Sequence, residues 1–211
     1  MTPLAKHSCG LSCSTALEVV GSEHGGPANR YVRQNPIPGV RIRDPRRQAI
    51  ETVSGMTYSE LCAIELLRDN NCMAAPRIRT HEVTTQDDTM LVPCGFLHYI
   101  LMDNASGVQL SKEIFWGYPR DERDRIREAY KEAWSEWIRC GVSGGGRHIS
   151  HLFWDSDAGK ITIAASSFSS PVEPFRSVKW RDSRWLAADL LRAGSTHSCA
   201  WKDWMRDTWI W

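Results

Sequence analysis

Two histidines and an aspartate lie close together in the second half of the chain, directly after three consecutive glycines. His148 and His151 are separated by two residues, and Asp155 follows four positions later. An unperturbed histidine has a pKa of about 6.5, so it can accept or donate a proton near neutral pH. We therefore predict catalytic acid–base residues here, with His151 as the leading candidate, then Asp155 and His148; a structural role for a lone histidine is the alternative.

The same histidine pair has the spacing of two metal ligands. A metal site needs a third and a fourth ligand, and the sequence identifies neither. The seven cysteines are odd in number and scattered, and only Cys9 and Cys13 lie close together. This pattern is typical of reduced thiols in a cytosolic protein rather than of a zinc site. We predict no metal and no cofactor.

Two further groups of residues indicate a ligand site. Three glycines in a row allow positive φ, so their amides can surround an anion, and a plain flexible loop is the alternative. A cluster of arginines in the first quarter of the chain either holds a phosphate or carboxylate or is a solvated face. The predicted ligand-binding residues from these groups are Gly144, Gly145, Gly146, Arg41 and Arg43.

Helices and short strands must position these residues. Helical spacing of apolar residues predicts a helix over 57–70, and a second apolar stripe predicts a long one over 119–141 that lies half buried. Segments 75–83 and 95–103 are expected to form a strand pair, and 151–155 and 160–165 a β-hairpin. Further helices are expected over 177–194 and 198–211. The predicted fold class is α+β and helix-rich.

The order of these elements resembles the protein-kinase-like superfamily, in particular small kinase-like proteins common in fungi and related to aminoglycoside and choline phosphotransferases. "SELCAIELLRDNNCMAAPRI" is similar to the family's C helix and the exit into its fourth strand. "GFLHYILMDNASGVQL" is similar to strand five and the hinge, and "RDERDRIREAYKEAWSEWIRCGV" to the long helix before the catalytic loop. The resemblance covers roughly Thr57 to Ile163, about half of the chain.

The resemblance implies a truncated protein-kinase-like fold. The expected divisions are a disordered tail (1–28), a reduced N-terminal lobe (29–103) and a helical C-terminal lobe (104–211). It also implies a ligand cleft between the lobes. That cleft would be lined by the hinge residues Met102 and Asp103, by the glycine loop and by Trp154 of the hairpin, beside the histidines.

The family's catalytic residues do not carry over. By the resemblance, Gly146 stands at the position of the catalytic Asp and His151 at that of the metal-binding Asn. Ala164 or Ala165 stands at the second metal-binding Asp. No lysine occurs between Lys6 and Lys112, so the phosphate-pairing lysine is missing too. Phosphoryl transfer relies on Mg²⁺ and a carboxylate, so the resemblance implies a degenerate site.

Composition limits the partners. Lys and Arg total 26 against 25 Asp and Glu, a net charge of +1 that offers no global field for nucleic acid. No apolar run has the length of a membrane span, so we expect a cytoplasmic protein without membrane contact. Six of the ten tryptophans follow residue 179. They predict a packed aromatic region, or an aromatic wall beside a ligand.

Three functions remain open at this point. The favoured one is a degenerate kinase-like protein of specialised metabolism that binds a small molecule or catalyses a metal-independent cyclisation, isomerisation or transfer. The second is an active small-molecule phosphotransferase whose acids are displaced. The third is a non-catalytic scaffold that binds a partner. A homodimer is left open.

Overall fold

The computed structural model describes residues 17–20, 28–34, 36, 44–50, 55–164, 169–172, 178–193 and 209–211. The α-helices are α1 (Gly55–Asp69), α2 (Lys112–Gly117), α3 (Arg120–Arg139) and α4 (Ser183–Ala187), with short 3₁₀ turns at Pro45–Gln48 and Ile149–His151. The strands are β1 (Leu17–Val20), β2 (Ala28–Arg33), β3 (Ile78–Thr85), β4 (Phe96–Met102), β5 (Val108–Gln109), β6 (Val142–Ser143), β7 (Leu152–Asp155), β8 (Lys160–Ile163), β9 (Ser170–Pro171), β10 (Arg192–Ala193) and β11 (Trp209–Ile210).

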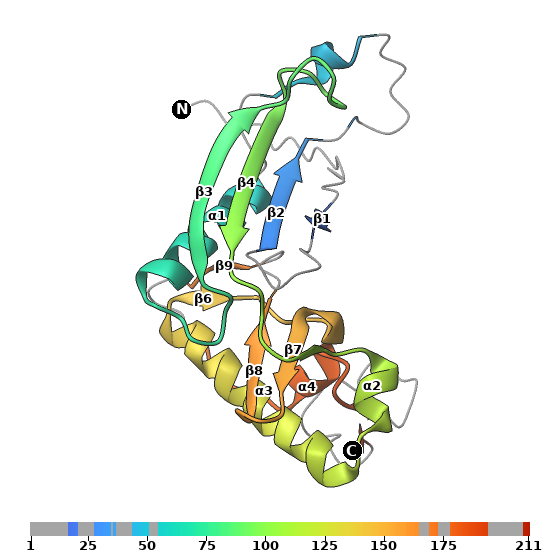
Figure 1. The fold of residues 1–211 in the computed structure, drawn as a ribbon. Coiled ribbons are helices and arrows are strands. Elements are labelled where there is room, and N and C mark those ends of the chain that lie inside the picture. Colours follow the sequence, from blue (N-terminus) through green and yellow to red (C-terminus); the bar gives the residue numbers. More distant parts are fainter. Residues whose placement is uncertain are drawn as a thin grey trace, which may run out of the picture.

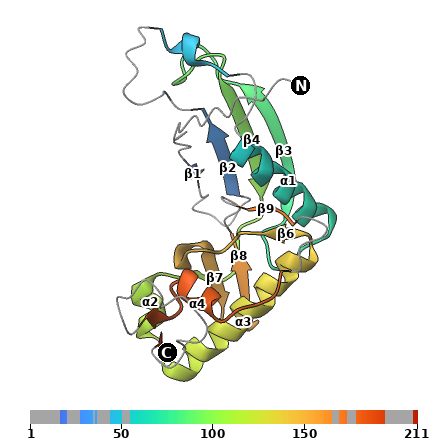
Figure 2. The ribbon, with the colours of Figure 1, turned by 180° about the vertical axis from the view of Figure 1, so that it is seen from behind.

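The first part of the structure is an antiparallel sheet with the strand order β1-β2-β4-β3. The helix α1 covers one face of it, behind the strands in Figure 1 and in front of them in Figure 2. The predicted pairing of β3 with β4 is confirmed, with Thr85 opposite Phe96 and a register shift near Ile78. Strand β1 falls within the segment that was expected to be a disordered tail.

The second part is built on α3, which runs diagonally along the lower half of Figure 1. Its predicted apolar stripe is confirmed, because Ile126, Tyr130, Ala133, Trp134 and Trp137 are all buried. The predicted hairpin of β7 and β8 is also confirmed, and it packs on α3. Strand β5 pairs with β7 and completes a three-stranded sheet.

The helical majority expected from the sequence is not confirmed. In the described residues, strands account for nearly as much of the chain as α-helices. The helix expected over 177–194 is reduced to α4, because the chain turns at Asp189 (φ +60°) and buries Leu190 and Leu191 in the core. The segment expected as a last helix ends in strand β11, which pairs with β10. Burial of Trp209 in this pairing outweighs the local helical pattern.

The tryptophan-rich end forms an aromatic cluster. Trp180 makes edge-to-face contacts with both Trp134 and Trp185, and Trp185 makes one with Trp211. Such pairs stabilise a core by about 0.5–1.5 kcal/mol beyond the burial of their area. Trp201 and Trp204 lie outside the described residues. None of the helices in the described ranges combines the length and apolar character that a bilayer crossing demands.

Candidate functional site

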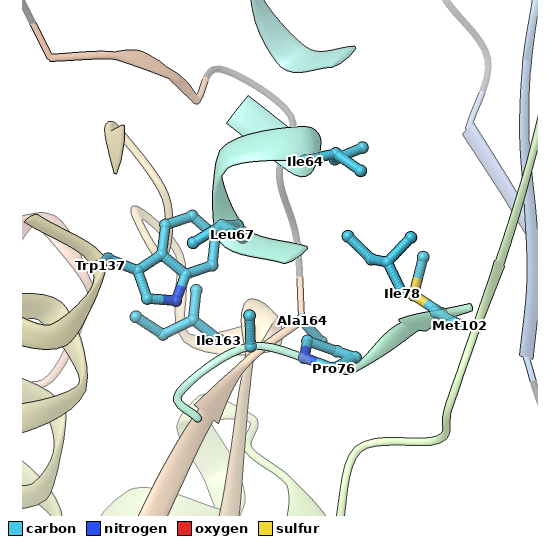
Figure 3. Close-up of a pocket in the computed structure, with 9 residues that line it drawn as sticks. Ile64, Leu67, Pro76, Ile78, Met102, Trp137, Ile163 and Ala164 are labelled. Atoms are coloured by element: carbon cyan, nitrogen blue, oxygen red, sulfur yellow. The ribbon is translucent and has the colours of Figure 1, made fainter. Parts of the chain in front are cut away.

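The two parts of the structure meet at a small apolar pocket. It lies between α1 (Ile64, Leu67), the ends of β3 and β4 (Ile78, Met102) and the lower part (Trp137, Ala164), as Figure 3 shows. Its volume is about 20 Å³, close to the space of one water molecule. This pocket therefore has room for about one water molecule.

Hydrogen bonds hold this junction together. The carbonyl oxygen of Ala74, in the loop between α1 and β3, accepts the indole N–H of Trp137 at 3.1 Å and the amide N–H of Ile163 at 2.9 Å. The side-chain amide of Asn70 donates to the Cys140 carbonyl at 3.3 Å. The loop between α1 and β3 is therefore fixed to both α3 and β8.

The glycine loop is packed against aromatic rings. A Cβ added at Gly145 would stand 2.1 Å from the ring of Trp137, and one at Gly146 would stand 3.2 Å from Tyr130. Gly144 and Gly146 have φ of +96° and +70°, a region that favours glycine. The hydroxyl of buried Tyr130 donates to the Gly146 carbonyl at 3.0 Å. Burial raises the pKa of Tyr130 to about 12, so the phenol keeps its proton.

The described residues of the junction do not fit a magnesium ion. Magnesium needs carboxylate, carbonyl or phosphate oxygens. Gly146 carries no side chain, its carbonyl is already bonded by Tyr130, and Ala164 contributes a methyl group to the apolar pocket. Neither Gly146 nor Ala164 therefore offers a side-chain oxygen through which a metal could take part in catalysis.

A polar cluster begins two residues after the glycines. Nδ1 of His148 lies 2.7 Å from the Ser150 hydroxyl and accepts the Ser150 backbone N–H at 3.2 Å. Because Nδ1 accepts an N–H, the ring proton belongs on Nε2, which faces the Asp189 carboxylate at 3.5 Å. His148 therefore has the arrangement of a general base, oriented by a carboxylate on one side and facing a hydroxyl on the other.

Asp189 reaches this cluster from a distant segment. It follows α4, and its φ of +60° is unusual for a residue other than glycine. Its carboxylate also forms an ion pair with Lys112, at the start of α2, with 3.0 Å between Oδ1 and the lysine Nζ. Non-glycine residues with positive φ occur more often at functional sites than elsewhere in proteins.

The other predicted catalytic residues have different surroundings. The ring of His151 lies beside that of His148, with 5.8 Å between the ring centroids. The backbone carbonyl of His151 accepts the Ala164 N–H. Asp155 lies at the far end of β7, where its carboxylate accepts the Ala158 N–H and shapes the hairpin turn. The structure therefore brings the two histidines together and separates Asp155 from them by the length of β7.

The predicted ligand-binding residues are similarly divided. Met102 lines the junction pocket, whereas the Asp103 carboxylate is paired with Arg79. Trp154 is 2% exposed, and its indole N–H donates to Glu122 at 2.8 Å. The remaining two, Arg41 and Arg43, lie outside the described residues.

The helix α1 carries two glutamates, Glu60 and Glu65. The Glu65 carboxylate lies 3.4 Å from Nε2 of His81 in β3, and Nδ1 of His81 lies 3.2 Å from Nε2 of His98 in β4. Glu60 is buried, with 7% exposure. Glu65 therefore ties α1 to the sheet through histidines.

Sequence reasoning missed Ser150, Asp189 and Lys112. Ser150 is close enough to His148 in the chain to have been noticed as a hydroxyl beside a candidate base. Asp189 and Lys112 gave no local signal, because only the folding of α2 and α4 toward the turn at residues 149–151 brings them near.

Comparisons with known proteins give limited likenesses. No family model matches the chain, and no curated protein matches its sequence. Among solved structures, the kinase PK-1 of the Cydia pomonella granulovirus is similar with 12% identity and a TM-score of 0.43, over 81% of this chain and 64% of that one. WaaP in complex with acyl carrier protein is similar with 15% identity and a TM-score of 0.45, over 82% and 69%. The chain thus spans less than two thirds of the viral kinase. TM-scores below one half give no basis for assigning a function.

Proposed function

We propose that this chain is a kinase-like protein that has lost metal-dependent phosphoryl transfer and performs metal-independent acid–base chemistry on a small molecule. The order of the elements supports the kinase-like part of the proposal, because the helix, the strand pair, the long helix and the hairpin follow one another as the resemblance predicts. The resemblance also supports a cytoplasmic protein of fungal specialised metabolism. That part of the proposal rests on the resemblance alone.

The packing of the glycine loop supports the loss of phosphoryl transfer. The position that would carry the catalytic carboxylate is glycine, and Tyr130 and Ile163 stand 3.2 Å from a Cβ built there. A carboxylate side chain at this position would need the Tyr130 ring and the Ile163 side chain to move.

The single observation that carries the proposed acid–base chemistry is the geometry of His148. In a neutral imidazole with Nε2–H directed at Asp189, Nδ1 faces the Ser150 hydroxyl but also accepts the Ser150 backbone N–H. Nδ1 can remove the hydroxyl proton once that backbone N–H releases the single lone pair of Nδ1. Deprotonated Ser150 would be a nucleophile toward esters or other acyl groups. His148 and Ser150 are therefore the proposed base and nucleophile, with Asp189 as the positioning residue.

The experiment for phosphoryl transfer is a thermal-shift titration with ATP and Mg²⁺. A ligand that binds only the folded state raises the melting temperature in proportion to its affinity. We expect no Mg²⁺-dependent rise at ATP concentrations that saturate ordinary kinases. A clear Mg²⁺-dependent rise would support the displaced-acid phosphotransferase instead.

The experiment for the base uses a fluorophosphonate, which reacts with base-activated serine hydroxyls. We expect wild-type protein to be labelled at Ser150, and His148→Ala to be labelled about 100-fold more slowly, the contribution of a general base. Ser143, whose hydroxyl donates to the Ser170 carbonyl, serves as an internal control and should stay unlabelled. Equal labelling of wild type and His148→Ala, or no labelling of Ser150, contradicts the proposal.

A further inference from the structure

Two buried cysteines and a glutamate converge where the loop after α1 meets the end of α3. One ligand atom from each of Cys72, Glu136 and Cys140 lies within 4.8 Å of the other two. Cys140 is 1% exposed and Cys72 is 9% exposed. Within the described residues, this is the only group of three such side chains close enough to share an ion.

We propose that Cys72, Cys140 and Glu136 bind a thiophilic divalent ion of the zinc type. Two thiolates and one carboxylate are a ligand set that zinc accepts, and sulfur ligands exclude magnesium and calcium. The sequence reading predicted no metal because these residues form no local motif. The fold brings them together by fixing the loop after α1 on the end of α3.

The surroundings of the three ligands match the outer shell of a metal site. The guanidinium of Arg139 donates to both Glu136 oxygens, at 2.6 and 2.8 Å, and its Nη2 lies 3.7 Å from the Cys140 sulfur. Such outer donors orient the ligands and stabilise thiolate charge. Two thiolates and a carboxylate carry three negative charges, which a divalent ion and Arg139 together neutralise. The filled site is therefore uncharged overall, which lowers the cost of placing two thiolates in a buried setting.

The structure also offers an entry path to Cys72. Cys72 lines a groove of about 590 Å³ that runs from the end of α1 to the start of β3. The neighbouring Met73 is 81% exposed, so solvent reaches the groove. Water entering from this groove would supply the fourth ligand.

The ion would act on structure rather than on the chemistry at His148. It would join the loop that carries Ala74 to the end of α3, beside the hydrogen bond from Asn70 to Cys140. A bound ion adds its binding free energy to folding, so it stabilises this junction. The proposal is therefore independent of the proposed acid–base function.

The test uses the reduced, metal-stripped full chain titrated with Cd²⁺ and then Zn²⁺. We expect sulfur-to-cadmium charge-transfer absorption that saturates at one ion per chain, displacement by zinc, and a rise in melting temperature. Cys72→Ser and Cys140→Ser should abolish the absorption, and Arg139→Gln should weaken binding about 10–100-fold. Cys62→Ser and Cys94→Ser, which change cysteines outside the cluster, should bind as wild type does.

A second measurement needs no variant, in case the serine substitutions prevent folding. Zinc should protect Cys72 and Cys140 of the wild-type protein from iodoacetamide in mild denaturant and leave Cys62 and Cys94 unprotected. The proposal is overturned if the reduced protein shows no charge-transfer absorption, or if zinc protects none of the four. It is also overturned if the metal-stripped protein forms a Cys72–Cys140 disulfide readily and never takes up zinc.

Discussion

The two halves of the loop between β6 and β7 have opposite character. Gly145 and Gly146 are packed against the rings of Trp137 and Tyr130, and Gly144 and Gly146 have positive φ, which favours glycine. His148 and Ser150, a few residues later, are polar and partly exposed; His148 contacts the Ser150 hydroxyl and faces Asp189. One half of the loop is therefore core, and the other half is available for chemistry.

Under the proposed function, the packed half of the loop has lost one chemistry and the exposed half supplies another. At Gly146, where the resemblance places a catalytic carboxylate, Tyr130 and Ile163 stand 3.2 Å from an added Cβ, so both would have to move to admit a side chain. Packing of this kind is intolerant of added atoms, because interiors are as dense as organic crystals. The exposed half is free of that constraint, since neither His148 nor Ser150 belongs to the core cluster.

The largest expected effect is on the packed half. Gly145→Ala places a methyl group 2.1 Å from Trp137, whose indole is fixed by its hydrogen bond to Ala74. Because the ring cannot swing away without breaking that bond, we expect a loss of about 3 kcal/mol in the free energy of unfolding, at the upper end for overpacking. Urea denaturation measures it.

The matched control is Gly117→Ala at the end of α2, where nothing lies within 4 Å of the added atom. Its effect should stay within about 1 kcal/mol of zero, because only the backbone propensity changes. Equal stability of the two alanine variants would show that the glycine loop is not packed as described.

A smaller effect is expected at Tyr130. Tyr130→Phe leaves the Gly146 carbonyl without its donor in a buried setting, at a cost of about 1–2 kcal/mol. The raised pKa adds a pH dependence. Above the unfolded value of 10, the unfolded chain loses the phenol proton while the folded chain keeps it up to about 12. Stability from this proton therefore falls as the pH rises between 10 and 12, by up to about 1.4 kcal/mol per unit.

The measurement is chemical denaturation of wild type and Tyr130→Phe across that pH range. The stability advantage of the wild type should fall as the pH rises and reverse in sign toward pH 12, because only the wild type has this phenol to lose its proton on unfolding. A difference that is constant with pH would mean that Tyr130 is not buried as its neutral form.

The elements that could be predicted from the sequence are those set by local patterns. The apolar stripe of α3 predicted burial of Tyr130 and Trp137, and turn residues predicted the hairpin of β7 and β8. The stripe could not indicate what these rings pack against. The sequence therefore left open whether the glycines bind an anion or form a flexible loop. The rings that they pack against, Trp137 and Tyr130, belong to the predicted apolar stripe.

The rest of the site depends on contacts between distant segments. Asp189 was placed in the middle of an expected helix, because the pattern around it is helical. Burial of Leu190 and Leu191 turns the chain out of the helix there and directs Asp189 toward His148. Cys72 and Cys140 likewise meet only through the fold, so a search for ligand spacing could not find them.

The smallest expected effect on stability is at Asp189, and it separates chemistry from packing in the exposed half. Asn tolerates the left-handed backbone that Asp189 adopts, so Asp189→Asn should change the free energy of unfolding by no more than about 0.5 kcal/mol. The neutral amide orients His148 less firmly and does not stabilise its protonated form, so fluorophosphonate labelling of Ser150 should slow by at least about tenfold. Lys112→Met is the control, because it removes the other partner of Asp189 and leaves the contact with His148 intact. If both variants label at the wild-type rate, Asp189 serves only as a surface ion pair, and His148 acts without an orienting carboxylate.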